Sequence, residues 1–103
     1  MRYVMGVDGG GSKTISLVAD GRGCLLGCGS GGPVNTNFCE QRTAVESVSQ
    51  AVQEALKSAG VQSEQVDRLC ISAPTEPGVT SRAMKRCGIR SVFRAAEGET
   101  PRW

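Results

Sequence analysis

Histidine is absent from this chain, which also lacks a C-x-x-C cysteine pair and any long apolar run. No stretch approaches the ~18 apolar residues of a membrane span, and the apolar run at the N-terminus is too short for a signal peptide. A net charge of +2 without histidine gives no case for nucleic acid or a membrane as a partner. A cytoplasmic location is therefore the default expectation.

Cysteine is present, but its pattern does not indicate a metal site. The five cysteines are odd in number and show no C-x-x-C pair, whereas zinc and iron–sulfur sites need closely paired ligands. In the cytoplasm these thiols would stay reduced. We expect Cys24, Cys70 and Cys87 in the core of a strand or helix, where a free cysteine behaves as a small hydrophobic residue.

The first part of the chain predicts strands. A length of 103 residues without internal repeats or a linker indicates one small domain at most. Apolar and β-branched residues predict short strands over residues 2–7, 14–19 and 24–28, which glycine-containing turns join into an antiparallel β-meander. Glycine, serine, proline and asparagine then predict a loop over 29–37.

A long helix follows that loop. Apolar residues at helical spacing lie on one face between Val45 and Ala59, and Gly60 stands where a left-handed C-terminal residue is expected. Two capping boxes fit its start equally: Asn37 with Glu40, and Thr43 with Glu46.

The remaining residues complete an α/β pattern. A strand is expected over 66–73, a short helix over 79–87 that ends at Gly88, and a last strand over 89–95. The order is then βββαβαβ. This order predicts a mixed sheet with the antiparallel β-meander at its N-terminal end.

The segment from Val4 to Thr14 carries most of the functional information, because a lone acid and three consecutive glycines stand between two apolar runs. Gly9, Gly10 and Gly11 allow positive φ and a close approach of the backbone to a ligand, so successive N–H groups can face an anion. The segment therefore predicts a phosphate-binding loop.

Polar side chains around these glycines fit the same interpretation. Asp8 supplies a carboxylate that suits a magnesium ion better than a phosphate, because hard divalent cations prefer oxygen ligands. Lys13 supplies a mobile positive charge, and Ser12 and Thr14 supply hydroxyl groups.

Two other glycine motifs fit less well. Gly6–Gly11 followed by Lys13 has the spacing of a P-loop, but Ser12 separates glycine from lysine and a strand, not a helix, is expected next. Gly27–Gly32 satisfies G-x-G-x-x-G, but Pro33 follows it without the immediate helix of a dinucleotide fingerprint.

Tyr3 to Thr14, together with Asp20-Gly21, the glycines of 27–32 with Pro33, and Asn35, resemble the amino-terminal part of the BadF/BadG/BcrA/BcrD ATPase family. This family includes N-acetylglucosamine kinases and belongs to the actin, hexokinase and sugar kinase superfamily, whose lobes have a ribonuclease H-like core in the order βββαβα. The resemblance implies that residues 1–103 are the N-terminal part of the first lobe. A second lobe would have no counterpart in this chain.

The resemblance also implies ATP and Mg²⁺ as cofactors. Gly9 to Thr14 would wrap the β and γ phosphates of ATP, and Asp8 would hold magnesium through its waters. The loop over 31–37 is similar to the stretch that faces the sugar in the family's kinases, so Asn35 or Asn37 would hydrogen-bond to substrate hydroxyls. An asparagine in this position is equally suited to cap the following helix.

The family's catalytic base is an aspartate just after the strand that we expect to end near Ala95. Glu97 stands nearest to that position, and its carboxylate could take the proton of a hydroxyl nucleophile. Its longer side chain would move the oxygen by about a bond length, and a carboxylate without a catalytic role fits the position equally well.

The expected function is the ATP-phosphate-binding portion of an ATP-dependent kinase that phosphorylates a sugar such as N-acetylglucosamine once a second lobe completes the cleft. Two alternatives stay open. One is the activator ATPase of a 2-hydroxyacyl-CoA dehydratase. The other is a non-catalytic lobe that associates with another protein or with itself as a homo-oligomer.

Overall fold

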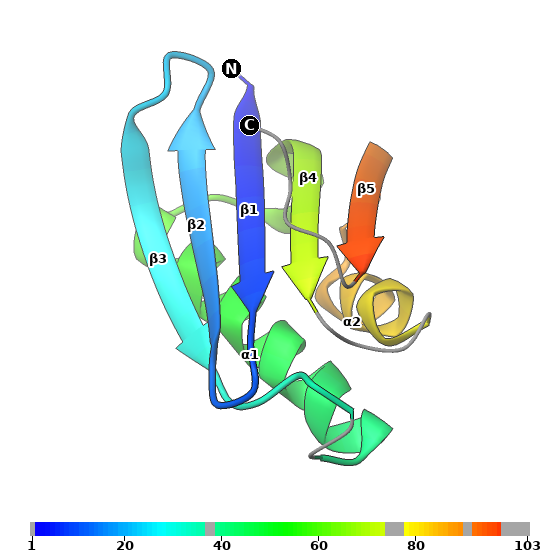
Figure 1. Cartoon of the computed structure of the whole chain (residues 1–103). Helices are drawn as coiled ribbons and strands as arrows, with labels where there is room; N and C mark the ends of the chain where they lie inside the picture. Colours follow the sequence, from blue (N-terminus) through cyan, green and yellow to red (C-terminus); the bar gives the residue numbers. More distant parts are fainter. Residues whose placement is uncertain (1, 37–38, 74–77, 90–91, 98–103) are drawn as a thin grey trace.

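A computed structural model describes residues 2–36, 39–73, 78–89 and the backbone of 92–97 (Figure 1). The observed elements follow the expected order βββαβαβ, with one short 3₁₀ helix, η1, that the sequence did not predict. They are β1 (Tyr3–Gly9), β2 (Thr14–Asp20), β3 (Leu25–Gly31), α1 (Gln41–Ala59), η1 (Ser63–Gln65), β4 (Val66–Ala73), α2 (Val79–Cys87) and β5 (Val92–Glu97). No helix among the described residues combines the length and the apolar character needed to cross a membrane.

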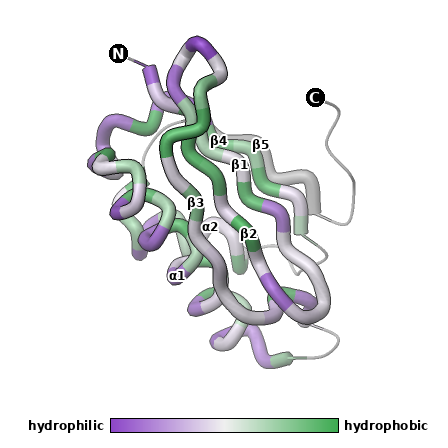
Figure 2. Tube along the Cα trace, turned by 90° about the vertical axis from the view of Figure 1, so that its left-hand side faces the viewer, coloured by the Kyte–Doolittle hydropathy of each residue, from purple (hydrophilic) through white to green (hydrophobic). Residues whose placement is uncertain are grey.

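The strands form one mixed sheet in the order β3-β2-β1-β4-β5, which confirms the predicted α/β class. β1, β2 and β3 are the antiparallel meander, whereas β1, β4 and β5 run parallel. The crossovers through α1 and α2 both advance in the same direction across the sheet, and right-handed crossovers of this kind place their helices on one face. Figures 1 and 2 show both helices on that face, so no described element covers the other.

The core lies between this covered face and α1. Alternate residues of β1 and β2 point inward, and Met5, Val7 and Val18 are almost fully buried. They pack in one cluster with the apolar side of α1, which includes Val48 and Val52. Full burial of one such side chain contributes roughly 1.5–3 kcal/mol, so this layer supplies most of the attraction between sheet and helix.

Three glycines on β3 let α1 lie directly on that strand. Gly27, Gly29 and Gly31 alternate along β3 and therefore share the face toward the helix. A Cβ atom at Gly27 would lie 2.8 Å from the carbonyl oxygen of Ala55, and Cβ atoms at the other two would overlap with the backbone of α1. The helix residues whose backbone atoms face these glycines are small and one turn apart: Ser47, Ala51, Ala55 and Ala59.

The end of α1 matches its prediction, but its start does not. Gly60 has φ 69° and donates its N–H to Lys57 O, as expected for a left-handed C-terminal residue. Gly88 ends α2 in the same way, with φ 76°. The helix begins at Gln41 with Glu40 in the N-cap position and no side-chain cap. Neither expected capping box therefore fits this start, and Asn37 lies outside the described residues.

The cysteine expectations need one correction. Cys24 is exposed, because it lies in the turn before β3, where its carbonyl oxygen accepts the N–H of Asp20 at 3.0 Å. Cys70 and Cys87 are half-buried. Burial raises the pKa of the Cys87 thiol, whose sulfur donates to Ser49 O at 3.7 Å, so this thiol stays protonated at neutral pH.

Replacing Gly29 by alanine is expected to lower the free energy of unfolding by about 1–3 kcal/mol, because the added methyl group would overlap with α1 at Ala51. Gly11→Ala is the matched control, since a methyl group there meets nothing within 4 Å. Urea unfolding followed by circular dichroism measures both variants. Equal stability would contradict the close helix–strand contact.

Candidate functional site

The turn between β1 and β2 is a tight hairpin formed by residues 10–13. Gly10 donates its N–H to Lys13 O at 2.9 Å, and β2 begins at the next residue. None of Gly9, Gly10 and Gly11 has a positive φ, so the expectation of left-handed glycines here is wrong. The strand after the turn is as predicted and excludes a P-loop, which requires a helix at this point.

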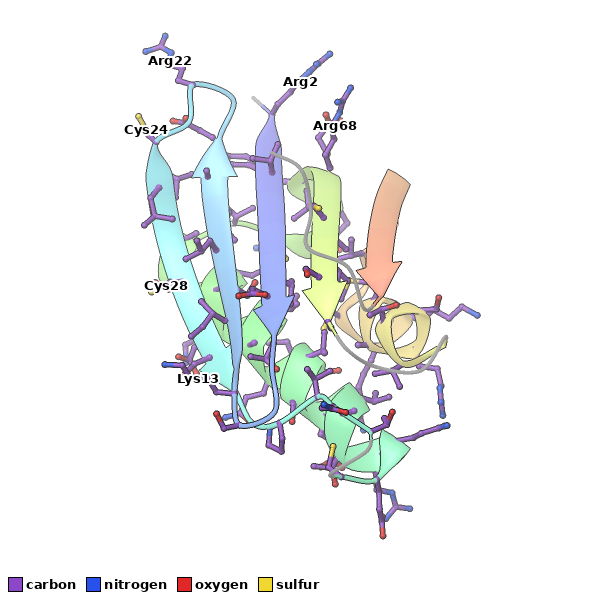
Figure 3. All side chains as sticks on the ribbon, viewed as in Figure 1. Arg2, Lys13, Arg22, Cys24, Cys28 and Arg68 are labelled. Carbon is purple, nitrogen blue, oxygen red and sulfur yellow. The ribbon has the colours of Figure 1, made fainter. Side chains whose placement is uncertain are left out.

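The tip of the hairpin faces solvent. Gly11, Ser12 and Lys13 are exposed, and no hydrogen bond is recorded for the amides of Gly11 and Ser12 among the described residues. The exposed Lys13 side chain lies at the same end of the sheet (Figure 3). The tip thus offers two free N–H groups and one positive charge to an anion.

Asp8 is the next-to-last residue of β1 and is exposed. Its neighbours Met5 and Val7 are buried under α1, so strand alternation places Asp8 on the uncovered face. The described residues contain no group of three or more His, Cys, Asp or Glu side chains that could hold a metal ion. Asp8 is therefore a single carboxylate beside the hairpin tip.

The side chain of Thr14 does not lie at the exposed tip, although the sequence placed it among the phosphate ligands. Thr14 is fully buried, and its hydroxyl group donates to Gly32 O at 2.9 Å. This hydrogen bond joins the start of β2 to the loop after β3. Thr14 thus anchors the hairpin to this loop from the buried side of the sheet.

The loop over 32–36 packs directly against the hairpin. Val34 donates its N–H to Gly10 O at 3.2 Å, and its side chain is fully buried. A Cβ atom at Gly9 would overlap with Val34 and lie 3.2 Å from the side chain of Ala73, so Gly9 is needed for packing. Sequence reasoning missed Val34. Its signal was a single β-branched apolar residue within a loop of glycine, proline and asparagine.

Of the two asparagines expected to bind the substrate, only Asn35 belongs to the described residues. Asn35 is half-buried on the loop, and its carbonyl oxygen accepts the Cys39 thiol at 3.4 Å. Asn37 lies outside the described residues.

The last predicted site residue, Glu97, ends β5, so the strand continues two residues beyond the expected end near Ala95. Glu97 is in register with Ala73 of β4, and β4 separates β5 from β1. Two strand spacings place its backbone about 10 Å from β1. Its side chain lies outside the described residues.

The predicted site residues whose backbone is described thus gather along one edge of the sheet. β1, β4 and β5 are parallel, and their carboxyl ends meet at the edge where the hairpin lies (Figure 1). Open α/β sheets bind ligands at this edge. The structure therefore brings Asp8, the hairpin, the loop of Asn35 and the end of β5 to one side of the molecule.

The fold is a ribonuclease H-like lobe, with a glycine-rich hairpin between its first two strands. The chain belongs to the BadF/BadG/BcrA/BcrD ATPase family, whose profile matches residues 5–83. The family is described as one of ATPases. No curated protein sequence matches the chain.

Solved structures share this fold. A Chromobacterium violaceum protein assigned as an N-acetylglucosamine kinase superimposes with a TM-score of 0.60 and 19% identity, over 94% of this chain and 35% of that chain. Component A of the Acidaminococcus fermentans (R)-2-hydroxyglutaryl-CoA dehydratase superimposes with a TM-score of 0.57 and 9% identity, over 92% of this chain and 31% of that one. A reductive activator for a corrinoid, iron–sulfur protein gives 0.57 and 11%, over 68% and 14%. The chain thus spans about a third or less of each structure.

Because Asp8 and Lys13 are exposed, Asp8→Asn and Lys13→Met are expected to change the free energy of unfolding by less than about 0.5 kcal/mol. Gly9→Ala should lower it by about 1–3 kcal/mol, because Val34 must move. Thermal and urea unfolding compare the three variants. A large loss of stability in Asp8→Asn would assign this carboxylate a structural role instead.

Proposed function

We propose that this chain is the ATP-phosphate-binding portion of a kinase that phosphorylates a sugar such as N-acetylglucosamine. The observation that carries the proposal is the exposed hairpin tip, where the amides of Gly11 and Ser12 are free, with the Asp8 carboxylate beside it. Phosphoryl transfer depends mostly on positioning the phosphates and neutralising their charge, and this arrangement supplies groups for both.

The donors divide according to their charge. The free amides and the Lys13 ammonium would bind the negative oxygens of the β and γ phosphates. Asp8 would hold Mg²⁺, which neutralises charge on the phosphates when it is bound. A single carboxylate suits this ion, because Mg²⁺ keeps several waters and takes further ligands from phosphates.

An acceptor site beside the phosphates is supported by the loop over 32–36. Val34 N and Gly10 O join this loop to the hairpin at 3.2 Å, so an acceptor held by Asn35 would lie next to the transferring group. We assign Asn35 and Asn37 to the sugar hydroxyls on this basis. Glu97 is the proposed general base, since β5 ends at the same edge of the sheet.

The runner-up is an activator ATPase of a 2-hydroxyacyl-CoA dehydratase. The similarity to the dehydratase component A supports it, but the fold similarity to the protein assigned as a kinase has the same weight. An iron assay on a protein extended beyond residue 103 separates the two proposals, since only the activator needs an iron–sulfur cluster.

Magnesium-dependent ATP binding tests the first proposal. Titration of the chain with Mg·ATP should shift the amide resonances of Gly11 and Ser12, and Asp8→Ala should weaken the binding at least about tenfold, because a charge-assisted contact is lost. Asp67→Ala is the matched control, since Asp67 is an exposed acid at the opposite end of the sheet. Binding that is equal in both variants, or that does not need magnesium, would contradict the assignment of Asp8.

A second candidate function, association of two copies, is favoured by the uncovered face of the sheet. The three large apolar side chains that are exposed among the described residues are Leu17, Leu25 and Leu26, at 44%, 62% and 37%. Leu17 precedes the buried Val18 and therefore points to the uncovered face. Leu26 precedes Gly27, which points to α1, and so lies on the same uncovered face. A register shift between Val18 and Ala19 lets Leu25 pair with Ala19 on that face as well. Exposed apolar surface of this kind marks interaction sites.

Light scattering should therefore show a dimer that forms with rising concentration and that Leu17→Lys abolishes. Gln53→Lys, on the exposed side of α1, is the control and should leave the dimer unchanged. A monomer at every concentration would remove the support for this candidate.

A further inference from the structure

We propose that Thr14 is a positioning residue that couples the phosphate hairpin to the acceptor loop, so that the two loops loosen and tighten as one unit. The assignment of phosphate to the hairpin and of an acceptor to the loop over 32–36 rests on the proposed function. The coupling itself rests on contacts between residues 9–14 and residues 32–34, which can be tested without any ligand.

Contacts of three described residues, Thr14, Val34 and Gly9, connect the two loops. The Thr14 hydroxyl donates to Gly32 O at 2.9 Å, and Val34 donates its N–H to Gly10 O at 3.2 Å. The third contact is apolar, because the Val34 side chain fills the space beside Gly9. Each contact has one partner on each loop.

The Thr14 contact is expensive to break. Thr14 is 0% exposed, so an unpaired hydroxyl group there has no water to replace its partner. The loop over 32–36 has no strand or helix of its own, so its position depends on contacts with its neighbours, among them the Thr14 bond and the Cys39 thiol that donates to Asn35 O at 3.4 Å. Loss of the Thr14 bond would remove one of the contacts that join this loop to the hairpin.

Thermodynamic coupling is reciprocal, so ordering either loop must order the other. Phosphate bound at the amides of Gly11 and Ser12 would restrain the hairpin and, through Gly10 O and Thr14, the acceptor loop. The acceptor would then bind more tightly in the presence of ATP, by the same factor by which it tightens ATP binding.

Amide hydrogen exchange measured by NMR on the ligand-free chain tests the coupling. Thr14→Val keeps the shape and the strand preference but removes the donor, and Val34 N–H should then exchange about fivefold to tenfold faster. Thr14→Ser retains the hydroxyl group and should restore slow exchange at Val34. Met5 and Val18, in the core strands, should be unchanged in both variants.

Two results would overturn the coupling: unchanged exchange at Val34 in Thr14→Val, or equal acceleration at Met5 and Val18. If Thr14→Val does not fold, Val34→Ala gives the reverse test, since a smaller side chain beside Gly9 should speed exchange at the Gly10 amide. Unchanged exchange at Gly10 would then count against the proposal.

Addition of Mg·ATP extends the test to the ligand. Val34 N–H should exchange more slowly with nucleotide in the wild-type chain and in Thr14→Ser, and should respond less in Thr14→Val. Shifts at Gly11 and Ser12 without a change at Val34 would overturn the coupling and leave the nucleotide site intact. No shift at Gly11 and Ser12 would contradict the nucleotide site, while the ligand-free exchange would still decide the coupling.

Discussion

The close approach of α1 to β3 is the contact on which the rest of the structure depends. It requires the absence of side chains at Gly27, Gly29 and Gly31, because any Cβ atom there would collide with the helix. With α1 packed on the edge strand, the chain leaves β3 at Gly31, and the residues that follow contact the first hairpin through Val34 N and Gly10 O. The position of the candidate acceptor loop therefore follows from a packing contact made elsewhere.

The glycine-rich segment combines packing and binding within a few residues. Gly9 cannot carry a side chain, because Val34 fills the space that its Cβ atom would take. Gly10 closes the turn by donating its N–H to Lys13 O. Only Gly11 has open space around it. The three glycines therefore have three different roles: Gly9 allows packing, Gly10 closes the turn, and Gly11 is exposed. Of the three, only Gly11 offers its amide to a ligand.

Much of this fold could be predicted from sequence because its elements carry their own periodicity and end signals. Val48 and Val52 lie one turn apart on the buried side of α1, and Gly60 ends the helix as predicted. The role of Thr14 could not be predicted, because its partner is a carbonyl group 18 residues away and every residue type has one. The first residue of α1 could not be predicted either, since helix boundaries are set by local contacts that a capping motif alone does not fix.

The position of Asp8 follows from the alternation of β1. The apolar side chains of Met5 and Val7 are buried on the face that α1 covers. A strand that buries alternate residues must turn the intervening ones outward. Asp8 is therefore exposed, and the next inward position, Gly9, ends the strand against Val34. A shift of register by one residue would bury the carboxylate in the core at a cost of several kcal/mol, so the apolar pattern that folds the sheet also presents this acid to solvent.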